Sequence, residues 1–249
     1  MKTSGLYEDY NATSVSGRAG YDRTEDIKSK ERVFNAHILP RIEAGGFKDA
    51  VDVGCGYGAY VSFMTGKGLI AQGVDLSQEQ IKVGRAQFGL ESIHTGDGMQ
   101  FLKGLPTASV DLVLLLDILE HLPLEVCIDM LGEVRRVLRT GGEVVVMCPN
   151  IHAPFQPTFS GDVTHVRAFS RASLRQLAMM AGFFEVTVCA QKMTPCTVMS
   201  SLRIFVWHIF FNPLLNALAV AMHGTNCGGI FSPNLVAVMK KASAASGGR

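Results

Sequence analysis

Residues 51–58 read Val51-Asp52-Val53-Gly54-Cys55-Gly56-Tyr57-Gly58, and this stretch decides the fold of the 249-residue chain. An apolar run comes directly before three glycines spaced two apart, and a helix-forming stretch follows. Side chains at these glycines would block the close approach of a ligand and would disfavour positive φ angles. The stretch therefore predicts a buried strand, a tight turn and a helix, with a nucleotide-like ligand against the turn.

The spacing of the glycines separates two classes of ligand. A dinucleotide fingerprint reads GxGxxG, whereas this turn reads DxGxGxG, with the third glycine one place early. An NAD-dependent oxidoreductase therefore remains an alternative that the spacing disfavours. Asp52 has two interpretations, since its carboxyl either fixes the turn or contacts the ligand.

Short apolar runs alternate with helical patterns along most of the chain. This alternation predicts an α/β fold with a mainly parallel, doubly wound sheet. The predicted strands are 50–53, 70–75, 91–95, 110–117, 143–149, 184–190 and 235–240, and the predicted helices are 24–44, 59–66, 78–88, 124–139 and 171–181.

Acidic residues follow three of these strands. Asp75 comes 21 residues after Gly54, where a carboxylate accepts hydrogen bonds from ribose hydroxyls. Asp97 is placed for the exocyclic amine of an adenine, and Asp117 closes the fourth strand. Because parallel strands end at one edge of a sheet, we expect these side chains in one crevice. Capping of the following helix is the alternative for Asp75 and Asp97.

The chain divides into a lead-in with a helix (1–44), a main domain (45–241) and a flexible tail (242–249). We expect the first segment to cap the ligand site. The main domain contains an insertion (191–233) between its last two strands.

The insertion is unusually apolar. From Ile204 to Met222, 19 residues carry no charged side chain. Asn212-Pro213 is expected to break this stretch into two short helices, a hairpin or lid. A single membrane crossing is excluded if the flanking strands share a sheet. The apolar surface is then covered by the protein itself, a second subunit, an apolar ligand or a membrane surface, and residues 197–222 would make the membrane contact.

Composition excludes several classes of function. The chain has 23 Lys and Arg against 22 Asp and Glu, which argues against binding to nucleic-acid backbones. Its six cysteines include no CxxC pair, so we predict reduced thiols, a cytoplasmic location and no metal site. The N-terminus has no apolar secretory stretch. The insertion raises the alternative of a peripheral position at the inner face of a membrane.

Four motifs in order, DVGCGYG (52–58), GVDLS (73–77), TGDG (95–98) and LLLDILEHL (114–122), resemble the class I S-adenosylmethionine-dependent methyltransferases. The resemblance implies a Rossmann-like, seven-stranded sheet with an antiparallel last strand, and S-adenosylmethionine as cofactor. It also implies that the methionine part of the cofactor lies beside Asp117. The expected cofactor-binding residues are Asp52, Gly54, Cys55, Gly56, Gly58, Asp75, Leu76, Asp97, Gly98 and Asp117.

Within that class the chain looks most like small methyltransferases of bacterial surface-polysaccharide biosynthesis and, more loosely, those of quinone biosynthesis. The supporting stretches are Cys148-Pro149-Asn150, 162–170 and 232–240. This resemblance implies O-methylation of a sugar hydroxyl on a glycan or lipid-linked glycan precursor. The alternatives are a quinone or other small phenolic acceptor, an N-methyltransferase, and a catalytically silent cofactor-binding protein. A homodimer through the insertion is also predicted as an option.

A hydroxyl acceptor has to lose a proton, which calls for a general base, and histidine suits neutral pH. His165 is the first candidate, on the long loop after the fifth strand, with Asp162 as its orienting partner. His121 is the second and His152 the third. We expect Arg167 to hold a phosphate or carboxylate of the acceptor, with His152 beside it.

Overall fold

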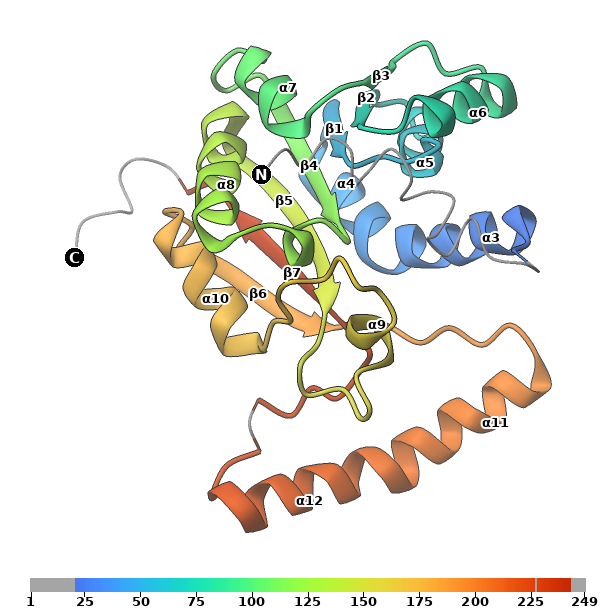
Figure 1. Ribbon diagram of the computed structural model, residues 1–249, viewed down its shortest axis with the longest axis vertical. Coiled ribbons are helices and arrows are strands. Elements are labelled where there is room, and N and C mark those ends of the chain that lie inside the picture. Colours follow the sequence, from blue (N-terminus) through green and yellow to red (C-terminus); the bar gives the residue numbers. More distant parts are fainter. Residues whose placement is uncertain (1–20, 227, 243–249) are drawn as a thin grey trace.

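The computed structural model describes residues 21–226 and 228–242, so the first 20 residues of the predicted segment 1–44 and all but the first residue of the predicted tail lie outside the described residues. A seven-stranded sheet carries helices on both faces (Figure 1). The strands are β1 (Asp49–Val53), β2 (Ile70–Asp75), β3 (Ile93–Thr95), β4 (Val110–Leu116), β5 (Leu138–Pro149), β6 (Glu185–Ala190) and β7 (Asn234–Lys240).

The helices alternate with these strands. They are α3 (Arg23–Val33), α4 (Leu39–Gly45), α5 (Ala59–Gly66), α6 (Gln78–Phe88), α7 (Gly98–Gly104), α8 (Leu124–Val137), α9 (Pro157–Ser160), α10 (Arg171–Met180), α11 (Val198–Val206) and α12 (Asn212–His223). Two π-helical segments, η2 (Phe34–Ile38) and η4 (Trp207–Phe211), join α3 to α4 and α11 to α12, and a 3₁₀ turn, η3 (Leu119–His121), follows β4.

The strand order is β3-β2-β1-β4-β5-β7-β6, and β7 runs antiparallel to both of its neighbours. The first six strands in the sequence are mutually parallel, so their carboxyl ends lie along one side of the sheet, which we call the carboxyl edge. The chain reverses its winding between β1 and β4. Ligands of open α/β sheets bind at such a reversal, outside the carboxyl ends of the strands.

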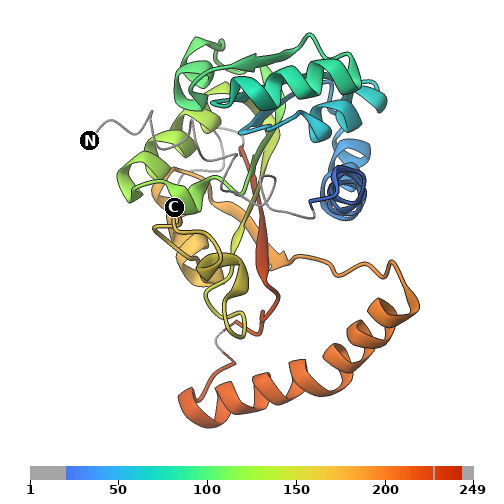
Figure 2. The same cartoon turned by 45° about the vertical axis from the view of Figure 1, so that its right-hand side comes forward.

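Helices cover both faces of the sheet, as Figure 2 shows from a second direction, and an apolar layer packs each set of helices onto the sheet. One layer joins η2, α4, α5 and α6 to the sheet, and Phe34, Ile38 and Met64 are buried within it. The other joins α7, α8 and α10 to the opposite face, around Leu102, Leu131 and Leu177. The central strands are buried on both sides, which is why they appear in the sequence as continuous apolar runs.

The predicted fold class is confirmed, with most boundaries within two residues. Strand β2 and helices α5 and α6 have the predicted bounds. Helix α7 was not predicted. Strand β5 begins at Leu138, directly after α8, whereas the predicted strand begins at residue 143.

The insertion differs from the predicted hairpin. Residues Val198–His223 form one continuous helix of 26 residues, which we call the insertion helix. It stands away from the sheet in both views (Figures 1 and 2). Pro213 does not break it, because the π-helical turn η4 widens the backbone just before the proline, and the N–H of Asn212 bonds to the carbonyl of Trp207 five residues back. A π-turn of this kind accommodates a ring that lacks an N–H.

Candidate cofactor and catalytic site

The glycine turn connects β1 to α5 at the carboxyl edge. Gly54, Gly56 and Gly58 have φ angles of 77°, 54° and 78°. At Gly54 the space is also closed, since a Cβ atom would collide with the side chain of Ile118. At Gly56 a Cβ atom would meet open space, so only the backbone conformation requires glycine there. Gly54 and Gly56 of this turn thus present their backbone to a pocket at the carboxyl edge.

Asp75 joins the end of β2 to this turn. Its Oδ2 accepts the N–H of Gly56 at 2.8 Å, and its Oδ1 accepts the N–H of Ser77 at 2.8 Å. Burial raises the pKa of Asp75, and these two hydrogen bonds oppose that shift. A carboxylate has about four acceptor positions, so two ribose hydroxyls can still bind. Leu76, the next residue, is half exposed beside it.

A pocket opens between the glycine turn and the end of β4. It is lined by Lys30, Asp52, Gly54, Cys55, Gly56, Tyr57, Tyr60, Leu116 and Asp117. Asp52 is 1% exposed, and its Oδ2 has no hydrogen-bond partner among the described residues. Burial raises the pKa of this carboxyl to about 7, against the opposing attraction of Lys30. The structure therefore brings Asp52 into the ligand pocket with one oxygen unused.

Lys30 is a pocket residue that the sequence analysis missed. Its Nζ lies 5.8 Å from the ring centroid of Tyr57 and 5.7 Å from that of Tyr60. The hydroxyl of Tyr57 donates to Asp26 at 2.6 Å, which fixes α3 against the turn. The available signal was helical spacing, because positions 26, 30 and 34 share one face of a helix and Phe34 is apolar.

Asp97 caps a helix. The residue is exposed, and its Oδ1 accepts the N–H of Gln100 at 2.9 Å at the start of α7. Gly98 begins that helix, and a Cβ atom there would collide with Val53 of β1. The capping alternative is thus present in the structure, and the predicted contact of Asp97 with adenine stays a prediction.

Asp117 follows β4 with a φ of 57°, an angle that non-glycine residues rarely adopt. Its surface opens into the pocket, but the surrounding protein desolvates the carboxyl and raises its pKa, while Lys30 and His165 oppose the shift. Asp117 therefore lies between the glycine turn and a second group of titratable side chains.

That second group contains two of the predicted catalytic histidines. The rings of His121 and His165 have centroids 4.6 Å apart, although one follows β4 and the other lies on the 150–170 loop after β5. His165 Nδ1 lies 3.0 Å from the carbonyl oxygen of Phe159. Since a carbonyl only accepts hydrogen bonds, Nδ1 carries the proton and Nε2 of the neutral ring keeps its lone pair.

His121 is oriented through Thr164. The Thr164 hydroxyl lies 2.9 Å from His121 Nδ1 and 2.6 Å from Asp162 Oδ1. The single hydroxyl proton goes to the carboxylate, so His121 Nδ1 is the donor to Thr164. Burial, followed by repulsion from His165, lowers the pKa of His121. Asp162 was predicted to orient His165. In the structure it orients His121 instead, through Thr164, and the carbonyl of Phe159 holds the ring of His165.

Glu120 is a second residue that the sequence analysis missed. Its side chain is fully buried, and neither carboxyl oxygen has a hydrogen-bond partner among the described residues. Burial and the nearby Asp117 raise its pKa well above the usual range. The Glu120-His121 pair directly after β4 was the available signal.

The same cluster is the one group of side chains in the described ranges with spacing suited to a metal ion. The ligand atoms of Glu120, His121 and His165 lie within 4.8 Å of one another, and Glu120 Oε1 is 4.0 Å from His165 Nε2. The sequence predicted no metal ligands, and both histidines were predicted only as bases.

Two predicted acceptor-binding residues lie on the same loop. The backbone N–H groups of Val166 and Arg167 donate to the carbonyl of Glu120 at 2.9 and 3.2 Å, which pins the loop to the end of β4. Arg167 Nε is buried without a described hydrogen-bond partner. The backbone N–H of His152 donates to Asn150 Oδ1 at 3.0 Å, and its ring is not part of the Glu120, His121 and His165 cluster. Acceptor binding by Arg167 and His152 stays a prediction.

Comparisons with known proteins agree with this geometry. Residues 51–146 match the model of a family described as a methyltransferase domain. A "probable S-adenosylmethionine-dependent methyltransferase" of Mycobacterium tuberculosis is 28% identical over 164 residues, which cover 64% of this chain and 56% of the relative. A similarly named protein of Mycolicibacterium smegmatis is 30% identical over 138 residues, covering 55% and 52%. The chain thus spans about half the length of the curated relatives it matches.

Among solved structures, the crystal structure of an S-adenosylmethionine-dependent methyltransferase from Archaeoglobus fulgidus superposes with a TM-score of 0.64. The two chains are 21% identical, and the match covers 95% of this chain and 99% of the other, so it shows a shared fold. Residues 51–146, which contain the glycine turn and strands β2 to β4, are thus similar to the methyltransferase domain family, and the sheet shares its fold with a solved S-adenosylmethionine-dependent methyltransferase.

Proposed function

We propose that the chain binds S-adenosylmethionine and transfers its methyl group to a hydroxyl group. The observation that carries the proposal is the connection between the glycine turn and Asp75, made at the carboxyl edge of a methyltransferase domain. The ribose of the cofactor binds Asp75, and its adenine lies toward Asp97. The amino-acid part enters the pocket of Lys30, Asp52 and Asp117, where the cation faces its carboxylate and the acids face its ammonium group.

His165 is the proposed general base. In the reaction the acceptor oxygen forms a bond to the methyl carbon as the carbon–sulfur bond breaks, and the sulfonium becomes a neutral thioether. The acceptor proton goes to Nε2 of His165, whose lone pair is fixed by the bond from Nδ1 to Phe159. Asp117 lines the pocket of the glycine turn and is near enough to His165 for that imidazole to oppose the rise of its pKa. General-base catalysis of this kind contributes roughly 10²- to 10⁴-fold.

We propose a sugar hydroxyl of a glycan or lipid-linked glycan precursor as the acceptor, with a quinone or other phenolic hydroxyl as the alternative. The half-buried Arg167 on the His165 loop, whose Nε has no hydrogen-bond partner among the described residues, supports an acceptor that carries a phosphate. The two acceptor classes differ in their need for a base. A phenol ionises near pH 10, far more easily than an alkyl hydroxyl, so loss of the base should slow its methylation less.

Calorimetry tests the cofactor. S-adenosylhomocysteine should bind the wild-type chain, and Asp75→Ala should weaken its binding by at least tenfold because the variant loses the ribose acceptor. NAD should not bind. Binding of NAD without binding of the sulfur nucleoside would overturn the proposal.

A methyl-transfer assay with labelled cofactor tests the base, using polyprenyl-linked sugars and hydroquinones as acceptors. His165→Ala should lower kcat by at least 100-fold and leave the affinity for S-adenosylhomocysteine unchanged. His94→Ala is the matched control, because His94 is exposed on β3. Equal turnover in the two variants would exclude His165 as the base.

A further inference from the structure

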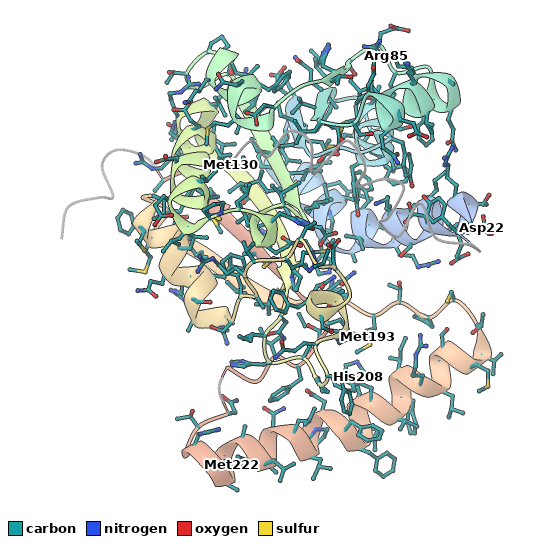
Figure 3. The ribbon with its side chains drawn as sticks, viewed as in Figure 1. Asp22, Arg85, Met130, Met193, His208 and Met222 are labelled. Carbon is teal, nitrogen blue, oxygen red and sulfur yellow. The ribbon has the colours of Figure 1, made fainter. Side chains whose placement is uncertain are left out.

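The insertion helix presents a large apolar surface outside the cofactor site. No residue of its most apolar 18-residue window is buried, and Figure 3 shows its side chains projecting from the ribbon along its whole length. At about 1.5 Å per residue its 26 residues extend for about 39 Å. The exposed large apolar side chains are Val198, Met199, Leu202, Phe205, Ile209, Phe210, Phe211, Leu214, Leu218, Val220 and Met222.

The arrangement of these side chains favours lipid over a second protein. Ile209, Phe210 and Phe211 are consecutive, and each is more than half exposed. Successive residues of a helix point in directions roughly 100° apart, so these three cannot lie on the single stripe that a partner helix covers. A bilayer surface covers such a wide apolar sector at once.

The connections at the two ends of the helix exclude a membrane crossing. The flanking strands β6 and β7 are direct neighbours, with Ala190 paired to Leu235. A crossing helix would place its far end about 39 Å from the sheet. The return link, residues 224–233, would then have to run almost fully extended through hydrocarbon with its backbone groups unpaired. A helix held at both ends on one side of the membrane lies in the plane of the surface.

The charge of the insertion matches an anionic surface. Residues 191–233 contain no Asp or Glu, and their charged residues are Lys192 and Arg203. Both cations are exposed and lie near the start of the insertion helix or in the link before it. Basic side chains near a bilayer with anionic lipids strengthen binding to that bilayer.

The insertion helix is connected to the carboxyl edge of the sheet, where the candidate site also lies. The end of β6 and the start of β7 lie beside Pro149, the last residue of β5, which leads into the 150–170 loop that carries His165. This loop lies between the sheet and the insertion helix in Figures 1 and 2. It exposes Phe155 and Val163 almost completely, at 97% and 99%. Two segments far apart in the sequence thus add apolar side chains to one edge.

We infer that the insertion helix lies in the interface of a membrane containing anionic lipids and holds the carboxyl edge toward the bilayer. Phe155 and Val163 contact the same surface. The acceptor is then an amphiphile whose reactive group lies at the level of the lipid headgroups, a consequence that rests on the proposed methyl transfer.

Vesicle binding tests the inference without any methyl transfer. The full chain is mixed with vesicles of phosphatidylcholine alone, or of phosphatidylcholine with phosphatidylglycerol, and sedimented. Trp207 in η4 is the one tryptophan of the sequence, so its emission reports on the insertion helix directly. We expect the chain to sediment with the anionic vesicles, its emission to shift to shorter wavelength, and lipids brominated near the headgroup to quench it more than lipids brominated at the chain ends.

Two matched variants locate the contact. Phe210→Asp changes a side chain of the insertion helix that is 62% exposed, and Phe184→Asp changes one that is 63% exposed beside the opposite end of β6. Phe210→Asp should reduce vesicle binding at least tenfold, whereas Phe184→Asp should bind as the wild type does. Both should retain their affinity for S-adenosylhomocysteine.

Three results would overturn the inference. In the first, the wild type binds neither kind of vesicle. In the second, both variants lose vesicle binding equally. In the third, the wild type forms a dimer that does not bind vesicles, and Phe210→Asp dissociates that dimer. The last result would assign the helix to a second copy of the chain. Failure of the proposed function is a separate outcome, because a chain that binds vesicles but not S-adenosylhomocysteine keeps the membrane contact and loses the methyltransferase proposal.

Discussion

Lys30 of α3 and Asp52 of β1 line one pocket, and the ammonium group of the lysine stabilises the ionised form of the buried carboxyl. Lys30 acts in the same way on Asp117 at the other side of the pocket. Two carboxyls and one cation therefore surround the space proposed for the amino-acid part of the cofactor. A bound zwitterion supplies a carboxylate to Lys30, which also pairs with Asp26 at 3.9 Å, and an ammonium group to the two acids.

The first prediction concerns Lys30. Lys30→Gln should weaken binding of S-adenosylhomocysteine by about tenfold or more, since a charge-assisted hydrogen bond contributes about 1.5–3 kcal/mol. Calorimetry measures the loss. Lys28→Gln is the control, because Lys28 is an exposed residue of the same helix. If both variants bind equally well, Lys30 serves only as a counterion within the protein.

Asp97 allows its two interpretations to be separated. Asp97→Asn keeps a helix cap, since Asn and Asp cap about equally well, but it removes the carboxylate offered to adenine. We expect an unchanged midpoint of thermal unfolding and a severalfold weaker affinity for S-adenosylhomocysteine. Asp97→Ala should lower both, with a loss of about 1 kcal/mol in stability. Wild-type affinity in the Asn variant would leave Asp97 with capping alone.

The sequence predicted the features that depend on local order. The glycine turn and the bounds of β2, α5 and α6 depend on residues close together in the chain, where the spacing of apolar residues and glycines is readable. Pro213 was misjudged for a local reason as well, because a π-turn can absorb a proline that an α-helical register cannot.

Lys30 and Glu120 were missed because tertiary packing gives them their role. Lys30 reaches the pocket because the hydrogen bond from Tyr57 to Asp26 fixes helix α3 against the glycine turn. Glu120 joins the histidine cluster only because the 150–170 loop folds back and brings His165 Nε2 to 4.0 Å from its carboxyl. The helical spacing of positions 26, 30 and 34 and the Glu120-His121 pair are readable in the sequence, but neither shows which partners tertiary packing supplies.

Thr164 provides a test of the histidine pair. Thr164→Val removes the hydroxyl that joins Asp162 to His121, so His121 loses its fixed orientation beside His165. We expect kcat to fall by about tenfold with little change in cofactor affinity, as for other groups that orient a catalytic histidine. Thr164→Ser keeps the hydroxyl and should restore turnover. If Val and Ser variants turn over equally, His121 has no part in the reaction.

The last prediction concerns the pH dependence of stability. The pKa of Asp52 is about 7 in the folded chain, against about 3.9 for an unfolded aspartate. Between these values the folded state holds a proton that the unfolded state has lost. The free energy of unfolding contributed by Asp52 therefore falls as the pH rises from about 4 to about 7, by on the order of a few kcal/mol.

Asp52→Asn replaces the carboxyl with a neutral group of the same shape. The decrease in the free energy of unfolding that Asp52 causes between about pH 4 and pH 7 should therefore disappear. Urea unfolding of both proteins across this pH range measures the difference, and Asp129→Asn, which changes an exposed carboxyl on α8, should retain the slope of the wild type. S-adenosylhomocysteine adds a second check. If its ammonium group faces Asp52, binding ionises the carboxyl, and wild-type calorimetry near pH 6 should record a released proton that the Asn variant does not release. A slope and a proton count identical in wild type and Asp52→Asn would mean that the carboxyl is ionised in the folded chain, with a partner other than the cofactor.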